Sequence, residues 1–386
     1  MKRMALIFNS DYRHWPMGGM ISYVIHTVSM LSDSFEIDLW GCAVNGHNPE
    51  PVEIGGISYP IHVNTKAKSQ KKLIPNVVKC FWGNMVGSAE FRSDRYDILY
   101  FHLSASELGW FWGEKLKHPI SSKTERPLVI LHQHGMAYGK AIGDRLDYYA
   151  MDQADLVFFT TDKNSLERHR QHIKNPNVVW MPSMVDTAFF HPVNTNAKEE
   201  IRNELGIGLD KKVFLFTGRI TSWKNPLLLL EAFEVYQRNN DGNGYLIFVG
   251  DGDCVCALRT RMEENLLGEH VRLTGKLERQ EIRTYLQASD VFVMPSRGEG
   301  VSISTLEAMA AGLPVVAFDV EGMSGLVDER SGVLIRQQSS GAFAAGMERA
   351  AKSQFHARAV AEQYSVEHVR DRMVQSIQDA LKGKKA

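Results

Sequence analysis

Two glutamates in one short stretch carry the strongest chemical signal in the sequence. Glu299 lies between Gly298 and Gly300 after an apolar strand, and Glu307 follows at the start of a predicted helix. The two glycines favour a loop around Glu299, and we expect Glu307 in the first turn of the helix. Both carboxylates can then reach one pocket, where the free N–H groups of the helix N-terminus suit a phosphate.

Each of these glutamates also has an interpretation without a ligand. Ser304 and Glu307 have the S-x-x-E spacing of a capping box, which stabilises a helix end by itself. Glu299 can be a solvated loop carboxylate. Spacing alone leaves both alternatives open.

Two cations follow another apolar strand. Residues 213–217 lead into Gly218-Arg219, and Lys224 stands just before a second predicted helix. Arginine offers a bidentate fork and lysine a point charge, and a diphosphate at the carboxyl end of a strand requires such cations. The alternative is that Arg219 and Lys224 are two solvated surface cations.

Two further motifs have less specific patterns. Asp251 and Asp253 form an Asp-x-Asp sequence, the form of a metal-binding pair, but they lie in a glycine-containing turn after a strand. We therefore interpret them as part of a loop and expect no metal there. His134 follows another strand, with His132 nearby.

Together these motifs resemble the retaining GT-B glycosyltransferases of glycosyltransferase family 4, which include bacterial lipopolysaccharide, capsule and phosphatidylinositol mannosyl transferases. The specific matches in the C-terminal half are Gly218-Arg219 with Lys224, Gly250-Asp251-Gly252, Leu273-Thr274-Gly275 and the pattern E-G-x6-E-A-M-A-x-G-x-P-V-V from Glu299 onward. The weaker matches in the N-terminal half are Gly18-Gly19, His134-Gly135, Asp155-Leu156-Val157 and Asp186. The resemblance therefore extends over nearly the whole chain.

The resemblance implies roles for these positions. Arg219 and Lys224 would hold the diphosphate of a nucleotide sugar, and Glu307 would bind the ribose. Glu299 and His134 would lie beside the donor sugar, and the alternative for His134 is a hydrogen-bonded structural histidine. The implied catalytic residues are Glu299, His134, Arg219 and Lys224. The implied substrate- and nucleotide-binding residues are Gly18, Gly19, Gly218, Gly250, Gly275, Lys276, Leu277, Gly300, Val301, Ser302, Ile303, Ser304 and Glu307. It implies no metal ligand and no cofactor, because the nucleotide sugar is a substrate.

The sequence departs from the family pattern at three places. Ser183-Met184 replaces an Asn-Gly pair, and Asn225 follows Lys224 where glycine is common. Val301 stands where the family commonly has phenylalanine, and this change puts the identity of the donor sugar in doubt.

The implied reaction transfers a sugar from a nucleoside diphosphate sugar, with UDP expected, to a glycan or lipid-linked acceptor with retention of configuration. It would serve the synthesis of a cell-surface polysaccharide or glycolipid. Such a reaction needs positive potential at the leaving diphosphate and a positioned acceptor hydroxyl. We favour front-face attack over a covalent adduct on Glu299. An epimerase-like enzyme and a non-catalytic nucleotide-sugar-binding subunit on the same fold stay open as alternatives.

The elements that must position these residues alternate between short apolar runs and helical patterns. Continuous apolar runs are typical of parallel strands covered on both faces. Strands are expected at 4–8, 35–40, 97–101, 128–131, 156–159, 213–217, 246–249, 291–294 and 314–318, and helices at 20–31, 162–172, 226–238, 282–289, 303–311 and from 366 onward. This alternation predicts an α/β fold of two doubly wound, Rossmann-like domains facing across a cleft, as in the GT-B fold.

A polar segment at 191–200 has no apolar periodicity and indicates the domain boundary. We expect an N-terminal acceptor-side domain at 1–190 and a C-terminal nucleotide-sugar-binding domain at 191–365. The helix at 366–386 is expected to pack back on the N-terminal domain.

Composition narrows the class of protein. The 386 residues include 44 Lys and Arg against 45 Asp and Glu, which excludes a globally basic nucleic-acid binder. Cys254 and Cys256 have the wrong spacing for a zinc or C-x-x-C redox pair, so reduced structural thiols are expected. The N-terminal apolar run is too short for a signal peptide, and no window suits a membrane span. A cytoplasmic location is expected.

One segment has a pattern suited to a membrane surface. Residues 54–89 contain no Asp or Glu, and between 66 and 85 lysines alternate with aliphatic and aromatic residues at helical spacing. Such a basic, amphipathic segment suits an anionic membrane. We expect peripheral contact through residues 66–85 at the inner face of the membrane, and the alternative is a core-facing helix with a solvated basic flank.

Overall fold

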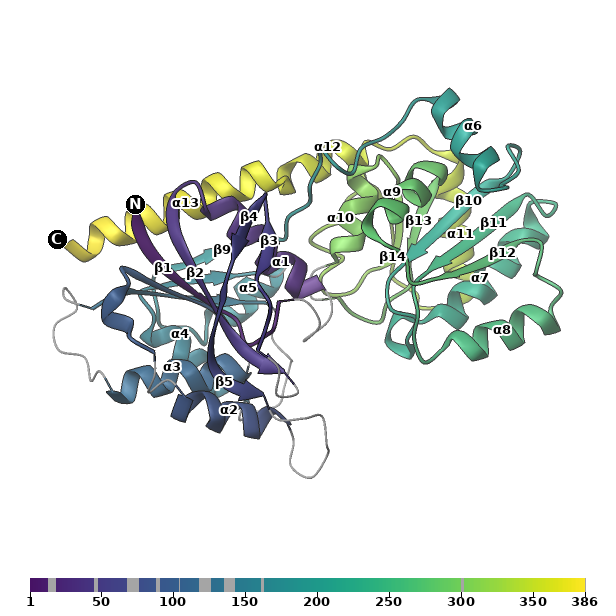
Figure 1. Cartoon of the computed structure of the whole chain (residues 1–386). Coiled ribbons are helices and arrows are strands. Elements are labelled where there is room, and N and C mark those ends of the chain that lie inside the picture. The colour runs from purple at the N-terminus through teal and green to yellow at the C-terminus, as the bar shows by residue number, and fades with distance from the viewer. Residues whose placement is uncertain are drawn as a thin grey trace. The chain divides into compact units, whose positions relative to one another are not determined.

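The computed structural model describes residues 1–12, 19–44, 48–67, 76–87, 91–103, 105–117, 126–134, 143–160, 163–299 and 302–385. The chain divides into two compact units. Unit 1 contains Met1–Ser183 and Val366–Ala386, and unit 2 contains Met184–Ser365. Each unit is an α/β domain built on one parallel sheet (Figure 1).

Unit 1 is built on a seven-stranded sheet with the strand order β5-β2-β1-β6-β7-β8-β9, in which every neighbouring pair is parallel. Its strands are β1 (Lys2–Ile7), β2 (Phe35–Val44), β5 (Ile61–Ala67), β6 (Ile98–Leu103), β7 (Leu128–Gln133), β8 (Leu156–Phe159) and β9 (Val178–Trp180). The antiparallel pair β3 (Val52–Ile54) and β4 (Ile57–Tyr59) lies between β2 and β5 in the chain. Its helices are α1 (Gly19–Leu31), α2 (Asn76–Gly87), the 3₁₀ turn η2 (Ser93–Arg95), α3 (Ala105–Lys117), α4 (Gly143–Gln153), α5 (Lys163–Arg170) and α13 (Val366–Lys385).

Unit 2 is built on a six-stranded parallel sheet with the order β12-β11-β10-β13-β14-β15. Its strands are β10 (Lys212–Thr217), β11 (Gly244–Val249), β12 (Val271–Gly275), β13 (Val291–Met294), β14 (Val315–Phe318) and β15 (Gly332–Ile335). Its helices are α6 (Thr195–Glu204), η3 (Ser222–Lys224), α7 (Pro226–Asn239), α8 (Val255–Glu264), α9 (Arg279–Ala288), α10 (Ile303–Ala310), α11 (Ser340–Lys352), α12 (Ala357–Ala361) and η4 (Glu362–Tyr364).

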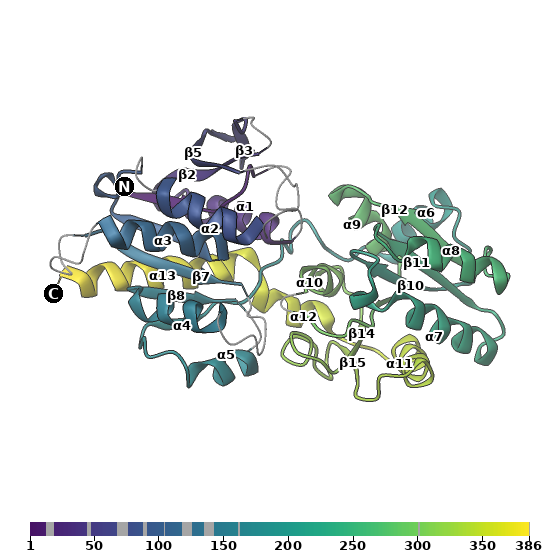
Figure 2. The same ribbon diagram turned by 90° about the horizontal axis from the view of Figure 1, so that it is seen from below.

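The inner strands are buried on both faces, as their continuous apolar runs predict. Every residue of β13 and β14 is buried, and so is every residue of β8. In unit 2, α7 and α11 pack on each other along one face of the sheet, and α6 and α9 pack together along the other (Figure 2). The expected α/β architecture of two doubly wound, Rossmann-like domains is confirmed.

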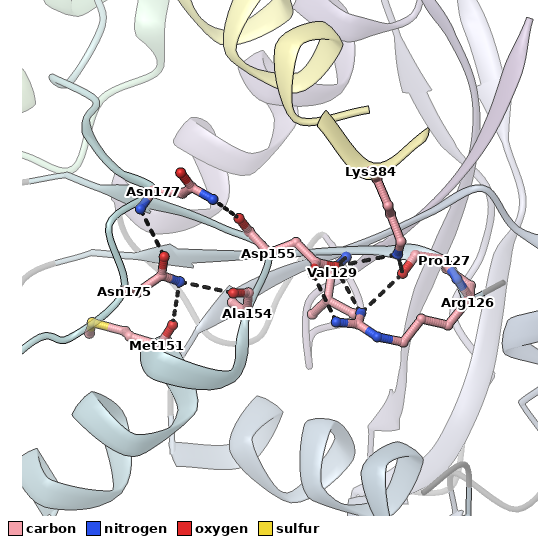
Figure 3. A network of polar contacts seen from close by, with 9 residues as sticks. All are labelled: Arg126, Pro127, Val129, Met151, Ala154, Asp155, Asn175, Asn177 and Lys384. Carbon is pink, nitrogen blue, oxygen red and sulfur yellow. Dashed lines mark hydrogen bonds and ion pairs between the residues drawn. The ribbon is translucent and has the colours of Figure 1, made fainter. Parts of the chain in front are cut away.

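A polar network holds the end of α13 in unit 1 (Figure 3). Asp155, at the start of β8, accepts two hydrogen bonds of 2.8 Å from the guanidinium of Arg126 and one of 2.8 Å from the backbone N–H of Val129. The ammonium of Lys384 on α13 donates to the carbonyl of Pro127 at 2.6 Å and lies 3.5 Å from the Asp155 carboxylate. Asp155 therefore joins the neighbouring strand starts to the C-terminal helix.

The boundary between the units falls at Ser183 and Met184, before the polar segment that the sequence pattern favours. Residues 184–190, between this boundary and the polar segment, pack with the second unit. Val185 pairs with Ser365 in a parallel bridge, and Phe190 is 1% exposed within the core of unit 2. In the part of the chain that the structure describes, no helix has the length and apolar character needed to span a membrane.

Candidate functional site

The strand order of unit 2 reverses between β10 and β13. The chain runs outward from β10 to β11 and β12, and then returns to place β13 on the other side of β10. Loops after two such strands diverge and leave room for a ligand at the carboxyl edge of the sheet. The loop after β10 carries Arg219 and Lys224, and the loop after β13 carries Glu299, so both predicted stretches lie at this edge.

Lys224 and Glu299 form an ion pair across this point. Nζ of Lys224 lies 2.5 Å from Oε1 of Glu299, and the two side chains are only 19% and 8% exposed. Trp223 joins the same two loops, because its indole N–H donates to the carbonyl of Gly298 at 2.7 Å and its own carbonyl accepts from the backbone N–H of Arg297 at 3.0 Å. Three contacts therefore fix the Glu299 loop against the end of η3.

A glycine holds the Glu299 loop from its other side. The backbone N–H of Glu299 donates to the carbonyl of Glu321 at 3.0 Å. Gly322 has a φ of +80°, and a Cβ at this position would lie 2.0 Å from the carbonyl oxygen of Glu299. Only glycine therefore allows the loop after β14 to approach Glu299 this closely.

The glycines predicted at the ends of β10, β11 and β12 lie side by side. Gly218 donates to the carbonyl of Val249 at 3.0 Å, and Gly250 donates to the carbonyl of Gly275 at 2.9 Å. A Cβ on Gly250 would lie 1.9 Å from the carbonyl oxygen of Gly218, so the two backbones are in direct contact. The backbone carbonyl of Asp251 accepts a hydrogen bond from a backbone N–H of the loop after β10, which agrees with a loop role for the Asp-x-Asp sequence.

The carboxyl group of Glu307 is placed differently from expectation. Ser302 is the N-cap of α10, which begins at Ile303, so Ser304 is inside the helix and Glu307 is in its second turn. The capping-box interpretation and the first-turn placement are therefore both wrong, because the cap position is two residues earlier than the S-x-x-E spacing requires. Burial raises the pKa of Glu307 to about 7, and the positive charge of Arg279 opposes that rise.

The remaining predicted residues lie in different surroundings. Arg219 and Lys276 are exposed at the ends of β10 and β12, while Leu277 packs on the core of unit 2. Ser302 is buried and its hydroxyl lies 2.7 Å from that of Thr305. Gly19 is the first residue of α1, after β1. Gly18, Gly300 and Val301 lie outside the described residues.

His134 follows β7 in unit 1 and lies beside two other histidines. Nε2 of His134 is 2.8 Å from Nδ1 of His102, and its ring stacks on that of His132 with the centroids 4.2 Å apart. Among the described residues, these three form the His/Cys/Asp/Glu group compact enough to be considered for a metal ion, and neither Asp251 nor Asp253 belongs to such a group.

Several residues that shape the site were absent from the sequence-based set. These are Trp223, Gly298 and Gly322 around Glu299, Arg279 beside Glu307, and His102 beside His134. Trp223 directly precedes Lys224 and Gly298 directly precedes Glu299, so both could have been identified from their positions in the motifs. Arg279 and His102 come close only through the fold.

The sequence of unit 2 matches a known family. Residues 197–367 match the family description "Glycosyl transferases group 1". The chain is 24% identical over 336 residues to the D-inositol 3-phosphate glycosyltransferase of Jonesia denitrificans, which covers 82% of this chain and 79% of that protein. A shorter match, 35% identical over 156 residues, is to the putative teichuronic acid biosynthesis glycosyltransferase TuaC of Bacillus subtilis and covers 40% of this chain and 37% of that protein.

Solved structures share the fold over the whole chain. Sucrose-phosphate synthase from Thermosynechococcus elongatus superposes with a TM-score of 0.76 at 18% identity, over 99% of this chain and all (100%) of that chain. Anabaena HepE in complex with UDP and glucose superposes with a TM-score of 0.71 at 18% identity, over 98% of this chain and 100% of that chain. Residues 197–367 are therefore similar to the group 1 glycosyl transferases, and the chain as a whole has the GT-B fold of two Rossmann-like domains.

Proposed function

We propose that this protein transfers a sugar from a nucleoside diphosphate sugar, with UDP as the nucleotide, and that the configuration of the sugar is retained. The observation that carries the proposal is the Lys224–Glu299 pair at the switch point of the unit 2 sheet. An ammonium and a carboxylate that are nearly buried together can serve the two halves of a nucleotide sugar, the anionic diphosphate and the hydroxylated ring.

Each side chain has a defined task in this proposal. Lys224 and the exposed Arg219 stabilise the negative charge that develops on the leaving diphosphate. Glu299 accepts hydrogen bonds from donor-sugar hydroxyls once Lys224 has turned to the diphosphate. Glu307, in its ionised form, accepts hydrogen bonds from the ribose hydroxyls. His134 contacts a hydroxyl of the sugar.

In the proposed chemical step the acceptor attacks the sugar directly, and no side chain of the protein acts as the nucleophile. The acceptor oxygen bonds to the anomeric carbon on the face from which the diphosphate leaves, and the bond from that carbon to the diphosphate oxygen breaks. The acceptor proton passes to the departing diphosphate oxygen. No cofactor or metal takes part, so EDTA should leave the rate unchanged.

Two acceptor classes follow from different observations. We propose a glycan or lipid-linked acceptor of a cell-surface polysaccharide or glycolipid, such as lipopolysaccharide, and the match to a teichuronic acid glycosyltransferase supports a surface polymer. D-inositol 3-phosphate is the second candidate, because the relative with that name matches across 82% of the chain and so includes most of unit 1. UDP is supported by the UDP complex of HepE.

The membrane proposal concerns α2 in unit 1. Trp82 and Val86 on this helix are 57% and 68% exposed, which leaves two large apolar side chains facing solvent. Lys68, Lys71 and Lys72 lie outside the described residues. We propose that residues 66–85 bind an anionic membrane from the cytoplasmic side.

A binding and turnover experiment tests the proposal. Thermal shift with UDP, GDP, ADP and CMP should give stabilisation by UDP, about 2.7 kcal/mol at 100 times the dissociation constant. Lys224→Met should lose this shift, while Arg336→Met, which removes an exposed cation elsewhere on unit 2, should keep it.

The outcomes separate the competing functions. Release of UDP from a UDP-sugar that depends on an added acceptor supports transfer, and mass spectrometry of the product identifies the acceptor. Conversion of the donor sugar without an acceptor would indicate an epimerase. UDP binding without turnover of any UDP-, GDP- or ADP-sugar would indicate a binding subunit, and no shift with any nucleotide would overturn the site itself.

A further inference from the structure

Three histidine rings are stacked at the carboxyl end of the unit 1 sheet. His102 on β6 is paired in register with His132 on β7, and His134 is two residues further along, so all three side chains lie on one face of the sheet. The ring of His134 lies 5.1 Å from His102 and 4.2 Å from His132, centroid to centroid, at interplanar angles of 13° and 19°.

His132 is held by hydrogen bonds at both ring nitrogens. Its Nδ1 lies 2.6 Å from the hydroxyl of Tyr100, and its Nε2 lies 2.6 Å from Oγ1 of Thr160. Thr160 in turn donates to the hydroxyl of Tyr23 at 3.4 Å, and the Tyr23 ring meets the ring of His134 edge-on at 4.8 Å. The ring of His132 is therefore fixed in orientation, and the ring of His134 stacks on it.

The His102–His134 hydrogen bond has two possible directions, and the surroundings of His102 distinguish them. Nε2 of His102 is buried without a hydrogen-bond partner among the described residues. A neutral imidazole carries one proton. If His102 accepted at Nδ1, its proton would be on Nε2, as a buried N–H without an acceptor. Orphaned buried donors are rarer than orphaned acceptors, so His102 carries its proton on Nδ1 and donates to Nε2 of His134.

The direction of this bond decides the protonation of His134. A neutral His134 that accepts at Nε2 must carry its own proton on Nδ1. Burial lowers the pKa of His134 to about 3, and the pKa values of His102 and His132 are lowered well below the usual range for the same reason, with the nearby imidazoles adding to the effect. All three rings are therefore neutral at physiological pH.

We propose that His102 is a positioning residue that holds His134 in the Nδ1–H tautomer, so that His134 offers a hydrogen-bond donor to an oxygen of the bound sugar nucleotide and does not act as a base. This inference rests on the proposed function, because the oxygen belongs to the proposed substrate. The tautomer of His134 itself is set by contacts within unit 1 and does not depend on the substrate.

A metal site is the competing interpretation of the same cluster. Ligand nitrogens of the three rings lie within 4.8 Å of one another. However, both nitrogens of His132 already have partners, and near-parallel stacked rings do not converge on a common point as the ligands of a tetrahedral ion do. The hydrogen-bonded arrangement accounts for more of the contacts.

Nitrogen NMR of histidine-labelled full-length protein tests the tautomer directly, with His134 assigned by comparison with His134→Gln. The wild-type chain should show protonation at Nδ1 of His134, unchanged between pH 8 and about 6, a range that stays about three pH units or more above the cited pKa. A proton on Nε2, or a charged ring at pH 6, would overturn the proposal. Zinc, nickel or iron bound one-to-one in purified protein would also overturn it.

Two substitutions separate positioning from simple packing. His102→Asn keeps an N–H donor near the position of Nδ1, and His102→Phe keeps an aromatic ring without one. Asparagine should preserve the Nδ1–H tautomer of His134, and phenylalanine should move the proton to Nε2 and lower kcat/KM for transfer by roughly 100-fold. As a matched control, His169→Phe removes a buried histidine bonded to Tyr148 at 2.7 Å and should leave the tautomer unchanged.

The two proposals can fail separately. A wild-type chain that shows the Nδ1–H tautomer but transfers no sugar would retain the positioning role and reject the function. A chain that transfers sugar equally well in both His102 variants would retain the function and reject the positioning role. If His102→Phe does not fold, the wild-type spectrum and His102→Asn still decide the tautomer.

Discussion

At the scale of single residues, Glu307 is the clearest case in which the fold changes a side chain's chemistry. Its carboxyl is buried enough to raise its pKa to about 7 although Arg279 opposes the rise. A ribose would bring hydroxyl donors to this carboxyl, and such donors stabilise its ionised form. Nucleotide binding should therefore be coupled to loss of a proton from Glu307.

This coupling gives a prediction for pH. Above pH 7 Glu307 is already ionised and UDP binds without releasing a proton. Below pH 7 the Glu307 carboxyl is protonated and must lose its proton when UDP binds. The dissociation constant of UDP should therefore rise by up to about tenfold for each unit by which the pH falls. Isothermal titration calorimetry between pH 5.5 and 8.5, within about two units of the cited pKa, measures this directly.

Glu307→Gln is the control for that measurement. The amide cannot ionise, so its affinity for UDP should be weaker and nearly independent of pH. A variant that kept the full pH dependence of the wild-type protein would assign the titrating group elsewhere.

Gly322 supplies a second prediction at this scale. Alanine would place a Cβ 2.0 Å from the carbonyl of Glu299, in a backbone conformation with φ of +80°. We expect Gly322→Ala to destabilise unit 2 by about 1–3 kcal/mol and to lower transfer more than the stability loss explains, because the Glu299 loop must move. Denaturant unfolding and initial rates measure the two effects.

Gly341 offers a matched glycine in the same unit. It lies in α11, and a Cβ there would meet nothing within 4 Å. Gly341→Ala should be neutral or stabilise the protein by about 0.5–1 kcal/mol, with normal transfer. Equal behaviour of the two variants would mean that the contact between Gly322 and Glu299 is not important.

The residues of the site could be predicted from sequence where they belong to a local motif. Lys224 and Glu299 were identified from their positions after apolar strands, and the structure pairs them. The links around them were not predictable in this way. Trp223 and Gly298 are 75 positions apart in the chain, and their contact exists only because β10 and β13 are neighbours in the sheet.

At the scale of elements, the strands of the two large sheets that sequence patterns missed share one property. These strands, β5, β9, β12 and β15, are the four edge strands of those sheets, and the separate short pair β3 and β4 was missed as well. An edge strand is partly solvated, so its apolar run is broken or short. Residues of β9 are all partly exposed, and four of the five residues of β12 are too. The inner strands were predictable because complete burial requires continuous apolar sequence.

The segment at residues 66–85, which includes most of α2, carries the prediction for membrane binding. Charge reversal at Lys68, Lys71 and Lys72 should reduce binding to vesicles of anionic phosphatidylglycerol by about 100-fold or more, at about 1 kcal/mol for each lysine. Flotation with vesicles of phosphatidylcholine alone gives the baseline.

Trp82→Ser should weaken binding to both vesicle types, because this ring is 57% exposed on α2. A triple reversal at the cations Arg330, Arg336 and Lys352 of unit 2 is the matched control and should leave binding unchanged. Equal loss in both triple variants would indicate only a general effect of net charge.

At the scale of the whole molecule, the two units differ in how the chain builds them. Unit 2 is one continuous segment, but unit 1 is completed by α13 from the far end of the chain. Val369, Met373 and Ile377 on this helix are buried. Apolar surface of unit 1 would therefore be exposed to water if the helix were removed.

Deleting residues 366–386 should affect the two units unequally. Unit 1 should lose its cooperative fold, which near-ultraviolet circular dichroism would detect because Trp223 is the one tryptophan of the seven outside unit 1. UDP binding should persist, because Arg219, Lys224, Glu299 and Glu307 all belong to unit 2. Loss of UDP binding together with the unit 1 signal would mean that the nucleotide site needs both units.

The pairing of Val185 with Ser365 has a consequence for how such proteins can diversify. The chain enters and leaves unit 2 at neighbouring points. The segment Met184–Ser365 is therefore arranged as a domain inserted into the sequence of unit 1. Recombination at these two points would exchange the proposed donor-binding unit in a single event and leave the rest of the chain unchanged. A small set of such units could generate many pairings of donor and acceptor.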